Sequence, residues 1–400
     1  MKRTKLSDIA SLTVGFVGTM AQHYVDSGIP FLRSLNIKPF YIDNTDLKYI
    51  SASFSEELSK SILHENDIVI VRTGIPGTCC VVPKEYDGCN CADVVIVHPD
   101  FSKVNPYYLA AYINIWGQKQ ILNNKVGAIQ QHFNVHTAED MLVFLPDKET
   151  QDHVANLICS VNEKIQVNER LCAELEAMAK TLYDYWFVQF DFPDENGKPY
   201  RTSGGAMEWC QELGREVPKG WKTTTIGDIT ICHDSERIPL SDNQRQEIFG
   251  EIPYYGATGM MGSVNRAIFD GDYVLMAEDG SVMDQQGHPI LQRIHHPCWI
   301  NNHAHVLEPK AEYSCMLLYM LLKDIPVVKI KTGSIQMKIN QANMNAYHII
   351  DIPAQLRLKA NGFLSHIDNQ IDEIKNENQE LSKLRDWLLP MLMNGQAFIH

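Results

Sequence analysis

Long hydrophobic runs are missing from this chain of 400 residues. The longest apolar stretches, such as Met316–Leu322, fall far short of the ~20 residues that a membrane-spanning helix requires. Met1–Lys5 is basic, but no apolar segment follows it, so we expect no secretory signal. Hydrophobic residues make up 44% and charged residues 21% of the chain, which is ordinary for a globular protein. We therefore expect a cytoplasmic protein of two or three domains with no membrane association.

Cysteine is too sparse for a disulfide scaffold, with ten residues in the whole chain. Zinc ribbons and fingers need C-x2-4-C pairs, and the one cluster of cysteines does not have this spacing. We therefore interpret the cluster as reduced thiols of a cytoplasmic protein, and the sequence assigns it no role. The cluster consists of Cys79, Cys80, Cys89 and Cys91.

Two histidines form the other candidate for a metal site. His303 and His305 would point to the same face of a strand, as a pair of metal ligands does. No Asp or Glu lies between Asp284 and Glu308 to complete the set of ligands. We therefore favour histidines of a binding surface or buried, hydrogen-bonded histidines, and we predict no metal in this chain.

Familiar catalytic motifs are absent as well, since the chain has no GxxxxGK[ST], no HExxH and no GxSxG. Asn105–Tyr108 is similar to the (N/D)PPY motif of amino-methyltransferases, but Tyr107 stands in place of the second proline. No glycine-rich cofactor turn accompanies it, so we interpret this segment as the start of a helix with proline at an early position. The sequence predicts a chain without catalytic residues.

An excess of basic charge is also lacking. The net charge is −14, and the segments 1–150, 151–220, 221–355 and 356–400 carry −3, −5, −5 and −1. Proteins that bind nucleic acid on their own usually carry a basic patch. If this chain binds DNA, we expect a partner to supply much of the contact with phosphates.

The chain does contain an internal repeat, which is the first thing to look for in a sequence of this length. Three pairs of segments match in the same order, at offsets of 220, 205 and 206 residues. The pairs are Leu6–Ile9 with Ile226–Ile229, Asn66–Val69 with Gly271–Val274, and Gly127–Gln130 with Gly333–Gln336. We infer a duplicated domain.

Each half ends in a predicted amphipathic helix, at Lys148–Tyr185 and at Ala354–Leu389, and each helix is roughly 50 Å long at 1.5 Å per residue. Apolar residues recur in steps of three and four along both, as in a heptad pattern. The first seam is Val161, Ile165, Asn168, Cys172, Leu175, Met178 and Leu182. The second seam is Ile367, Ile371, Ile374, Asn378, Leu381, Leu384 and Leu388. Matching seams predict a mutual coiled coil in which the two asparagines fix the register, although each helix could instead pack on its own domain.

Short runs of β-forming residues, separated by glycine and proline, fill the rest of each half. The clearest runs are Ile68–Val71, Val94–His98, Tyr273–Met276 and His303–Leu307. One short helix is expected in each copy, at Tyr107–Trp116 and at Tyr313–Leu322. The fold class is therefore α+β, with two repeated domains joined by two long helices. The expected segments are mixed domains at 1–147 and 221–353, long helices at 148–186 and 354–400, and a linker at 187–220.

In these features the chain resembles, along its full length, the specificity subunit of type I restriction–modification systems. Leu182–Pro193 and Leu213–Trp221 are similar to the central conserved region of the family, and Leu388–Gln396 is similar to its distal conserved region. Three further segments are similar to recurrent segments of target-recognition domains: Ile252–Gly259, Asp279–Gly280 and Asn301–Leu307.

This resemblance implies a function. Each mixed domain would be a target-recognition domain that reads one half of a bipartite, asymmetric site in double-stranded DNA. The helices would form an antiparallel coiled coil with pseudo-two-fold symmetry. Two methyltransferase subunits and restriction or translocase subunits would dock on the chain. They would bring S-adenosylmethionine, ATP and magnesium, while this chain would bind no cofactor itself.

Candidate DNA-binding residues follow from side-chain chemistry, because Gln and Arg are the usual bidentate readers of adenine and guanine. The candidates are Arg72, Gln130, Gln131 and His132 in the first domain, and Tyr255, Thr258, Arg266, Gln336 and Lys338 in the second. Gln130 and Gln336 are equivalent under the repeat, and they could instead cap a turn in each domain. Lys338 fits a phosphate contact better than a base contact. An alternative function also stays open: a duplicated coiled-coil scaffold that binds proteins without reading DNA, which the acidic charge favours.

Overall fold

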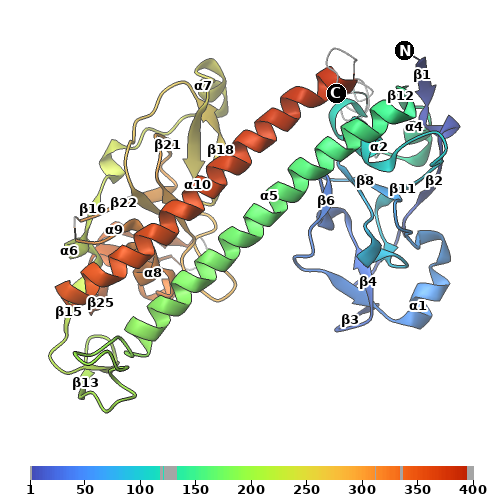
Figure 1. Ribbon diagram of the computed structural model, residues 1–400. Coiled ribbons are helices and arrows are strands. Elements are labelled where there is room, and N and C mark those ends of the chain that lie inside the picture. The colour runs from blue at the N-terminus through green and yellow to red at the C-terminus, as the bar shows by residue number, and fades with distance from the viewer. Residues whose placement is uncertain (1, 118–119, 121–132, 311, 334–336, 394–400) are drawn as a thin grey trace. The chain divides into compact units, whose positions relative to one another are not determined.

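The computed structural model describes residues 2–117, 120, 133–310, 312–333 and 337–393. The chain forms two compact units. Unit 1 comprises Met1–Asn168 and Glu377–His400, and unit 2 comprises Glu169–Asn376. Both divisions fall inside the long helices α5 (Lys148–Tyr183) and α10 (Ala354–Met393), so each unit contains a stretch of both helices (Figure 1).

The centre of unit 1 is a four-stranded sheet with the order β2-β11-β8-β9, in which all neighbours are antiparallel. Its strands are Ala10–Val14, Val94–Pro99, Ile68–Val71 and Cys79–Val81. Alternate residues of β8 and β11 belong to two different apolar cores, one on each side of the sheet. Because side chains alternate between the faces of a strand, covering both faces explains the unbroken apolar runs in these two strands.

The remaining elements of unit 1 complete these two cores. A second sheet has the order β10-β4-β7-β3, with β4 and β10 parallel; its strands are Asn90–Cys91, Ile29–Leu32, Lys48–Ile50 and Tyr24–Val25. Two-stranded pairs join β1 (Lys2–Lys5) to β12 (Leu142–Leu145) and β5 (Ile37–Lys38) to β6 (Tyr41–Ile42). The short helices are α1 (Ala52–Glu57), α2 (Pro106–Tyr112) and α4 (Val135–Glu139).

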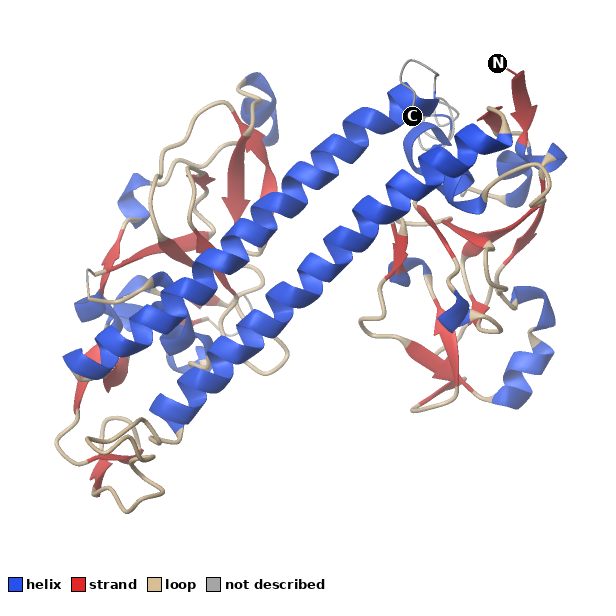
Figure 2. Ribbon diagram, viewed as in Figure 1, coloured by secondary structure: helices blue, strands red, loops and turns tan. Residues whose placement is uncertain are grey.

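Unit 2 has a central sheet of equivalent strand order and a second sheet with one strand fewer than that of unit 1. Its central sheet has the order β16-β22-β19-β20, again with all neighbours antiparallel; the strands are Thr230–Cys232, Ala304–Pro309, Tyr273–Ala277 and Leu291–Ile294. A three-stranded sheet has the order β18-β17-β21, with β17 and β21 parallel; its strands are Gly259–Val264, Ile252–Gly256 and Trp299–Ile300. Figure 2 shows the strands and helices of each unit.

The other elements of unit 2 are two-stranded pairs and short helices. The two-stranded pairs are β13 (Met207–Cys210) with β14 (Arg215–Pro218), β15 (Lys222–Thr225) with β25 (His348–Asp351), and β23 (Lys331–Thr332) with β24 (Lys338–Ile339). The helices are α6 (Ile226–Ile229), α7 (Asp242–Glu247), α8 (Cys315–Lys323) and α9 (Gln341–Asn345).

The four strand runs expected from the sequence correspond to β8, β11, β19 and β22, and the two expected short helices correspond to α2 and α8. The helix interpretation of Asn105–Tyr108 is confirmed: the Asn105 side chain accepts hydrogen bonds from the amides of Tyr107 and Tyr108, and Pro106 occupies the first turn. One expectation is wrong. His303 lies in a turn before β22, so it does not share a strand face with His305.

The long helices lie side by side within each unit, where stretches of α5 and α10 run in opposite directions (Figure 1). In unit 1 the Asn168 amide donates to the Asn378 side-chain oxygen over 2.8 Å, and Arg385 donates to Asn162 over 2.8 Å. Asn168 is 2% exposed. A buried amide needs such partners, so this pair restricts how the two helices can slide past each other.

In unit 2 the two helices are tied to the central sheet by charged side chains, of which those of Arg293 and Asp368 are buried. Arg293, at the end of β20, lies 2.8 Å from Asp368 of α10 and 3.0 Å from Glu176 of α5. His295 lies 3.3 Å from Asp368 and 2.8 Å from Asp272. We call these five side chains the helix anchor.

Two residues expected on the seams lie outside the contact. Met178 is 60% and Leu384 is 48% exposed. A heptad alternates steps of three and four, and this alternation places Ala179, which is fully buried, and Arg385 on the contact instead. In each predicted seam, two successive steps of three residues lead to a large apolar residue, Met178 or Leu384. Two such steps turn the stripe of side chains away from the face of the helix that makes the contact.

The helix ends also differ slightly from expectation. α5 ends at Tyr183 and continues as a π-helical turn over Asp184–Val188. α10 runs past Pro390 to Met393, although proline usually interrupts a helix. Leu392 and Met393 are buried in the core of unit 1, and this packing keeps the last turn helical. Among the residues described, no helix combines the length and apolar character needed to cross a membrane.

Candidate nucleic-acid interface

In both units the residue that follows an inner strand of the central sheet contacts the residue that precedes the cap of a short helix, through different atoms. In unit 2 the amide of Ile339 donates to the carbonyl of Glu278, directly after β19, over 2.8 Å. In unit 1 Arg72, directly after β8, donates through Nε to the carbonyl of Phe133 over 3.2 Å. Ile339 and Phe133 each precede the asparagine that caps a short helix, α9 or α4. We call this position in each unit the strand-end edge.

In unit 2 the segments that carry the family resemblance meet at this edge. The amide of Asn301 donates to the carbonyl of Tyr255 over 3.0 Å. The Asn301 side chain accepts from the amide of His303 over 2.8 Å, and His303 Nδ1 lies 2.6 Å from Asp279. A continuous hydrogen-bonded path therefore joins β17 to Asp279. The backbone of Asp279 pairs with that of Lys338 as an isolated antiparallel β-bridge.

The hairpin β17–β18 holds two of the candidate residues. The Tyr255 hydroxyl lies 3.0 Å from His296 Nε2, and burial raises the pKa of Tyr255 to about 12. This side chain is therefore engaged within unit 2. Thr258 is exposed in the turn of the hairpin, and Gln292 fixes that turn by donating to the carbonyls of Gly256–Ala257 over 2.9 and 3.1 Å.

The basic candidates differ in how firmly they are held. Arg266 is exposed, and its guanidinium lies 5.5 Å from the centre of the Trp299 ring. Lys338 is exposed and forms an ion pair of 2.8 Å with Glu278. Arg72 is half-buried. Four other candidates lie outside the described residues: Gln130, Gln131, His132 and Gln336.

The sequence did not point to the charged residues that lie behind this edge in unit 2. Arg237 Nη1 lies 2.6 Å from Glu278, and Asp234 lies 2.5 Å from His305 Nδ1. Burial alone would raise the pKa of Glu278, but its hydrogen bonds with Lys338 and Arg237 outweigh burial and lower it. The position of Glu278–Gly280 directly after a predicted strand is a weak sign that these residues belong to a site. The sequence around Arg237 gives no sign that this residue belongs to one.

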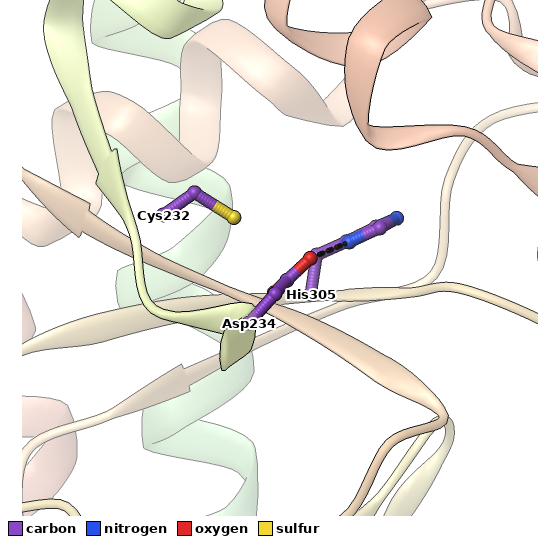
Figure 3. A group of neighbouring side chains, drawn as sticks. All are labelled: Cys232, Asp234 and His305. Atoms are coloured by element: carbon purple, nitrogen blue, oxygen red, sulfur yellow. Dashed lines mark hydrogen bonds and ion pairs between the residues drawn. The ribbon is translucent and has the colours of Figure 1, made fainter. Parts of the chain in front are cut away.

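Three side chains of this region, Cys232, Asp234 and His305, lie close enough to hold a metal ion (Figure 3). The hydrogen bonds favour another role. His305 Nε2 lies 3.1 Å from the carbonyl of Ile339, and Asp234 accepts from the amide of Val306 over 3.0 Å. Burial raises the pKa of the Cys232 thiol to about 11. Each ring nitrogen of His305 thus faces an oxygen of this chain, which fits a hydrogen-bonded structural role for the three side chains.

The cysteine cluster of unit 1 belongs to the cores of the sheet. All four residues are buried. Cys79 donates to the carbonyl of Ala110 over 3.2 Å, and burial raises the pKa of every thiol in the cluster. Protonated thiols in an apolar core behave as small hydrophobic side chains.

Comparison with known proteins shows what this chain is similar to. Residues 218–383 match the family described as the type I restriction modification DNA specificity domain. The chain is 22% identical over 348 residues to the specificity subunit of the type I restriction enzyme HindI from Haemophilus influenzae, covering 70% of this chain and 73% of that protein. It is 22% identical over 282 residues to the specificity subunit of MjaIX from Methanocaldococcus jannaschii, covering 65% of this chain and 61% of that protein.

The fold is similar to a solved structure over the whole chain. The S subunit of a type I restriction–modification system from M. genitalium superimposes with a TM-score of 0.53 and 15% identity, covering 100% of this chain and 96% of that one. The fold and the matched segment thus indicate an α+β protein in which residues 218–383 are similar to a DNA-specificity domain. The chain is similar to the specificity subunits of type I restriction–modification systems, as its resemblance to that family indicated.

Proposed function

We propose that this chain reads a bipartite, asymmetric site in double-stranded DNA on behalf of a type I restriction–modification complex. The observation that carries the proposal is the duplication: both units have a central sheet of the same strand order and both have a strand-end edge. Two readers in one chain require two half-sites, and half-sites on one face of DNA lie about one helical turn apart, ~10 bp. Because the two units differ in sequence, the two half-sites should differ as well.

The long helices would connect the two readers as an antiparallel coiled coil, with the units related by a pseudo-two-fold axis. The contacts between Asn168 and Asn378, and between Arg385 and Asn162, support the antiparallel direction. We propose that two methyltransferase subunits dock on the helical parts, and that restriction or translocase subunits join them. These partners would carry S-adenosylmethionine, ATP and magnesium, and this chain would take no catalytic part. The complex would act in the cytoplasm.

Partners would also account for the acidic charge. A net charge of −14 opposes DNA binding by this chain alone, because phosphate contacts supply most of the non-specific affinity of DNA-binding proteins. The same charge favours the alternative function, a scaffold that binds proteins and no DNA. Binding of a DNA duplex by the complex, weakened by salt, would distinguish the two.

The test is a genome-wide map of adenine methylation in the source cell, with and without this chain. We expect one split, asymmetric motif to lose its methylation when the chain is removed, and to regain it on complementation. If a complex with methyltransferase subunits can be isolated but no motif depends on the chain, DNA reading is refuted and the scaffold function stands.

A further inference from the structure

Five ionisable side chains of unit 2 form one connected network behind the strand-end edge. Glu278 is at its centre, 2.6 Å from Arg237 and 2.8 Å from Lys338. Asp234 joins the network through Arg237, at 3.4 Å, and through His305, at 2.5 Å (Figure 3). The network therefore connects segments that are far apart in the sequence. These are the segment after β16, the end of β19, and the strands β22 and β24.

Arg237 is held by several internal partners. Its side chain is 10% exposed. Besides Glu278, it donates to the carbonyl of Asp234 over 2.9 Å and to the carbonyl of Ala304 over 2.6 Å, and its Nη2 lies 3.4 Å from the Asp234 carboxylate. Because this side chain is mostly buried and fixed by internal acceptors, we assign Arg237 to the framework.

The two carboxylates of the network have different partners. Asp234 faces Arg237 and His305, and the ring of His305 lies between the Asp234 carboxylate and the carbonyl of Ile339. Glu278 faces two cations, the guanidinium of Arg237 and the ammonium of Lys338. Lys338 is therefore the second cation on a carboxylate that already has an internal partner.

This second cation is at the surface. The Lys338 side chain is 54% exposed, whereas the side chains of Glu278 and Arg237 are 10% exposed. A buried carboxylate that loses its only partner is strongly destabilising. Glu278 would keep Arg237 if Lys338 moved away, so Lys338 can leave its carboxylate at low cost.

We propose that Lys338 is a phosphate contact that the protein holds in reserve, and that Glu278 and Arg237 are positioning residues for the half-site read by unit 2. In the absence of DNA, Glu278 holds the lysine at the edge. On binding, a DNA phosphate replaces Glu278 as the partner of the lysine, while Arg237 keeps Glu278 in place. The inference rests on the proposed function, because it takes unit 2 to be a DNA reader.

Glu278 also determines where the neighbouring segment lies. Its own amide donates to the carbonyl of His303 over 2.8 Å, and its carbonyl accepts from the amide of Ile339 over 2.8 Å. The next two residues are Asp279, which pairs with His303, and Gly280, which has a φ of 73°. Loss of the Glu278 charge would loosen this turn, which lies beside Lys338.

The experiment uses the complex of this chain with its methyltransferase subunits and a duplex carrying the motif found by methylation mapping. Two further sets of duplexes carry single base-pair changes, one set in each half-site. Lys338→Met should weaken binding severalfold to all duplexes and reduce the slope of log affinity against log salt by about 1, because one phosphate contact is lost. Lys222→Met, which removes an exposed lysine from β15 of the same unit, is the matched control and should leave the slope unchanged.

Glu278→Gln should have the opposite effect. Affinity for changed duplexes should hold or rise, because Lys338 loses its internal competitor, while discrimination should fall only for the half-site read by unit 2. A network with a merely structural role would weaken binding without regard to half-site. The inference is overturned if Lys338→Met keeps the wild-type salt slope, or if Glu278→Gln affects both half-sites equally.

Two outcomes separate this inference from the proposed function. If the wild-type complex shows no preference among the duplexes, the proposed function itself fails. If the wild-type complex discriminates but the variants behave like Lys222→Met, only the inference fails. Should Glu278→Gln fail to assemble, the salt slope of Lys338→Met decides alone, because removal of an exposed side chain leaves the buried ion pairs intact.

Discussion

Replacing Asp368 with asparagine removes the carboxylate at the centre of the helix anchor without changing the size of the side chain. Asp368 is 3% exposed and lies 2.8 Å from Arg293 Nε and 3.3 Å from His295 Nε2. Removing one partner of a buried pair costs about 3–5 kcal/mol. Arg293 keeps Glu176 at 3.0 Å and the Tyr319 ring at 4.6 Å, so we expect a loss near the lower limit, about 3 kcal/mol.

The pH dependence gives the same substitution a second readout. Burial alone would lower the pKa of His295, but the carboxylates of Asp368 and Asp272 outweigh burial and raise it to about 9. A raised pKa means that the folded chain holds the proton more tightly than the unfolded chain, whose histidines titrate near pH ~6.5. The stabilisation is therefore complete below about pH 6.5 and is lost as the pH rises through about 9. Asp368→Asn should remove much of this dependence.

The assay is hydrogen exchange of the intact chain, followed on the stretches of α5 and α10 that belong to unit 2, at pH values from 6 to 9 after correction for intrinsic rates. A loss of about 3 kcal/mol should raise local opening about a hundredfold. Glu373→Gln, which removes an exposed carboxylate from the same helix, is the control and should leave exchange unchanged. If Asp368→Asn exchanges like Glu373→Gln, or keeps the wild-type pH dependence, the reasoning about the anchor is wrong.

Three further predictions follow from the helices, the strand-end edge of unit 1 and the cysteines. Leu175→Asp should destabilise the chain by about 1–3 kcal/mol and impair subunit docking, because it places an unpaired charge at a partly buried apolar position of the seam; size-exclusion chromatography of the complex that shows normal assembly would contradict this. Arg72→Ala should weaken DNA binding by the complex in a mobility-shift assay and leave assembly intact; unchanged affinity and unchanged site preference would remove Arg72 from the reading set. Iodoacetamide at pH 8 should modify the four clustered cysteines only after unfolding, because burial raises the pKa of each thiol; rapid labelling of the native chain, seen by mass spectrometry, would count against a core role.

Local patterns predicted the secondary structure well. Ile68–Val71 was expected as a strand and is β8, with all four residues buried. Asn105 was expected before a helix and caps α2, since a capping side chain acts only on the next turn. The residues of the helix seams were predicted less well. Leu384 is a large apolar residue next to the contact face, yet Arg385 makes the contact between the helices because its side chain reaches Asn162.

The candidate site was predicted only in part. Lys338 and Tyr255 lie in segments that meet at one edge, but Tyr255 is engaged with His296 and Lys338 with Glu278. Sequence reasoning named the residue types that contact DNA, because those follow from the chemistry of base edges and phosphates. It could not name Glu278 or Arg237, because their ion pair joins residues that lie 41 positions apart in the chain.

The sequence by itself determined the α+β class, the two long helices and the similarity to type I specificity subunits, because periodicity and motifs are local features of a chain. Only the tertiary structure decided the charge networks. Asp234 and His305 are 71 residues apart in the chain, and Arg293 meets Asp368 from another element altogether. Their charges are stable in the interior only because folding brings opposite charges within about 3 Å, and no spacing within a single element encodes that meeting.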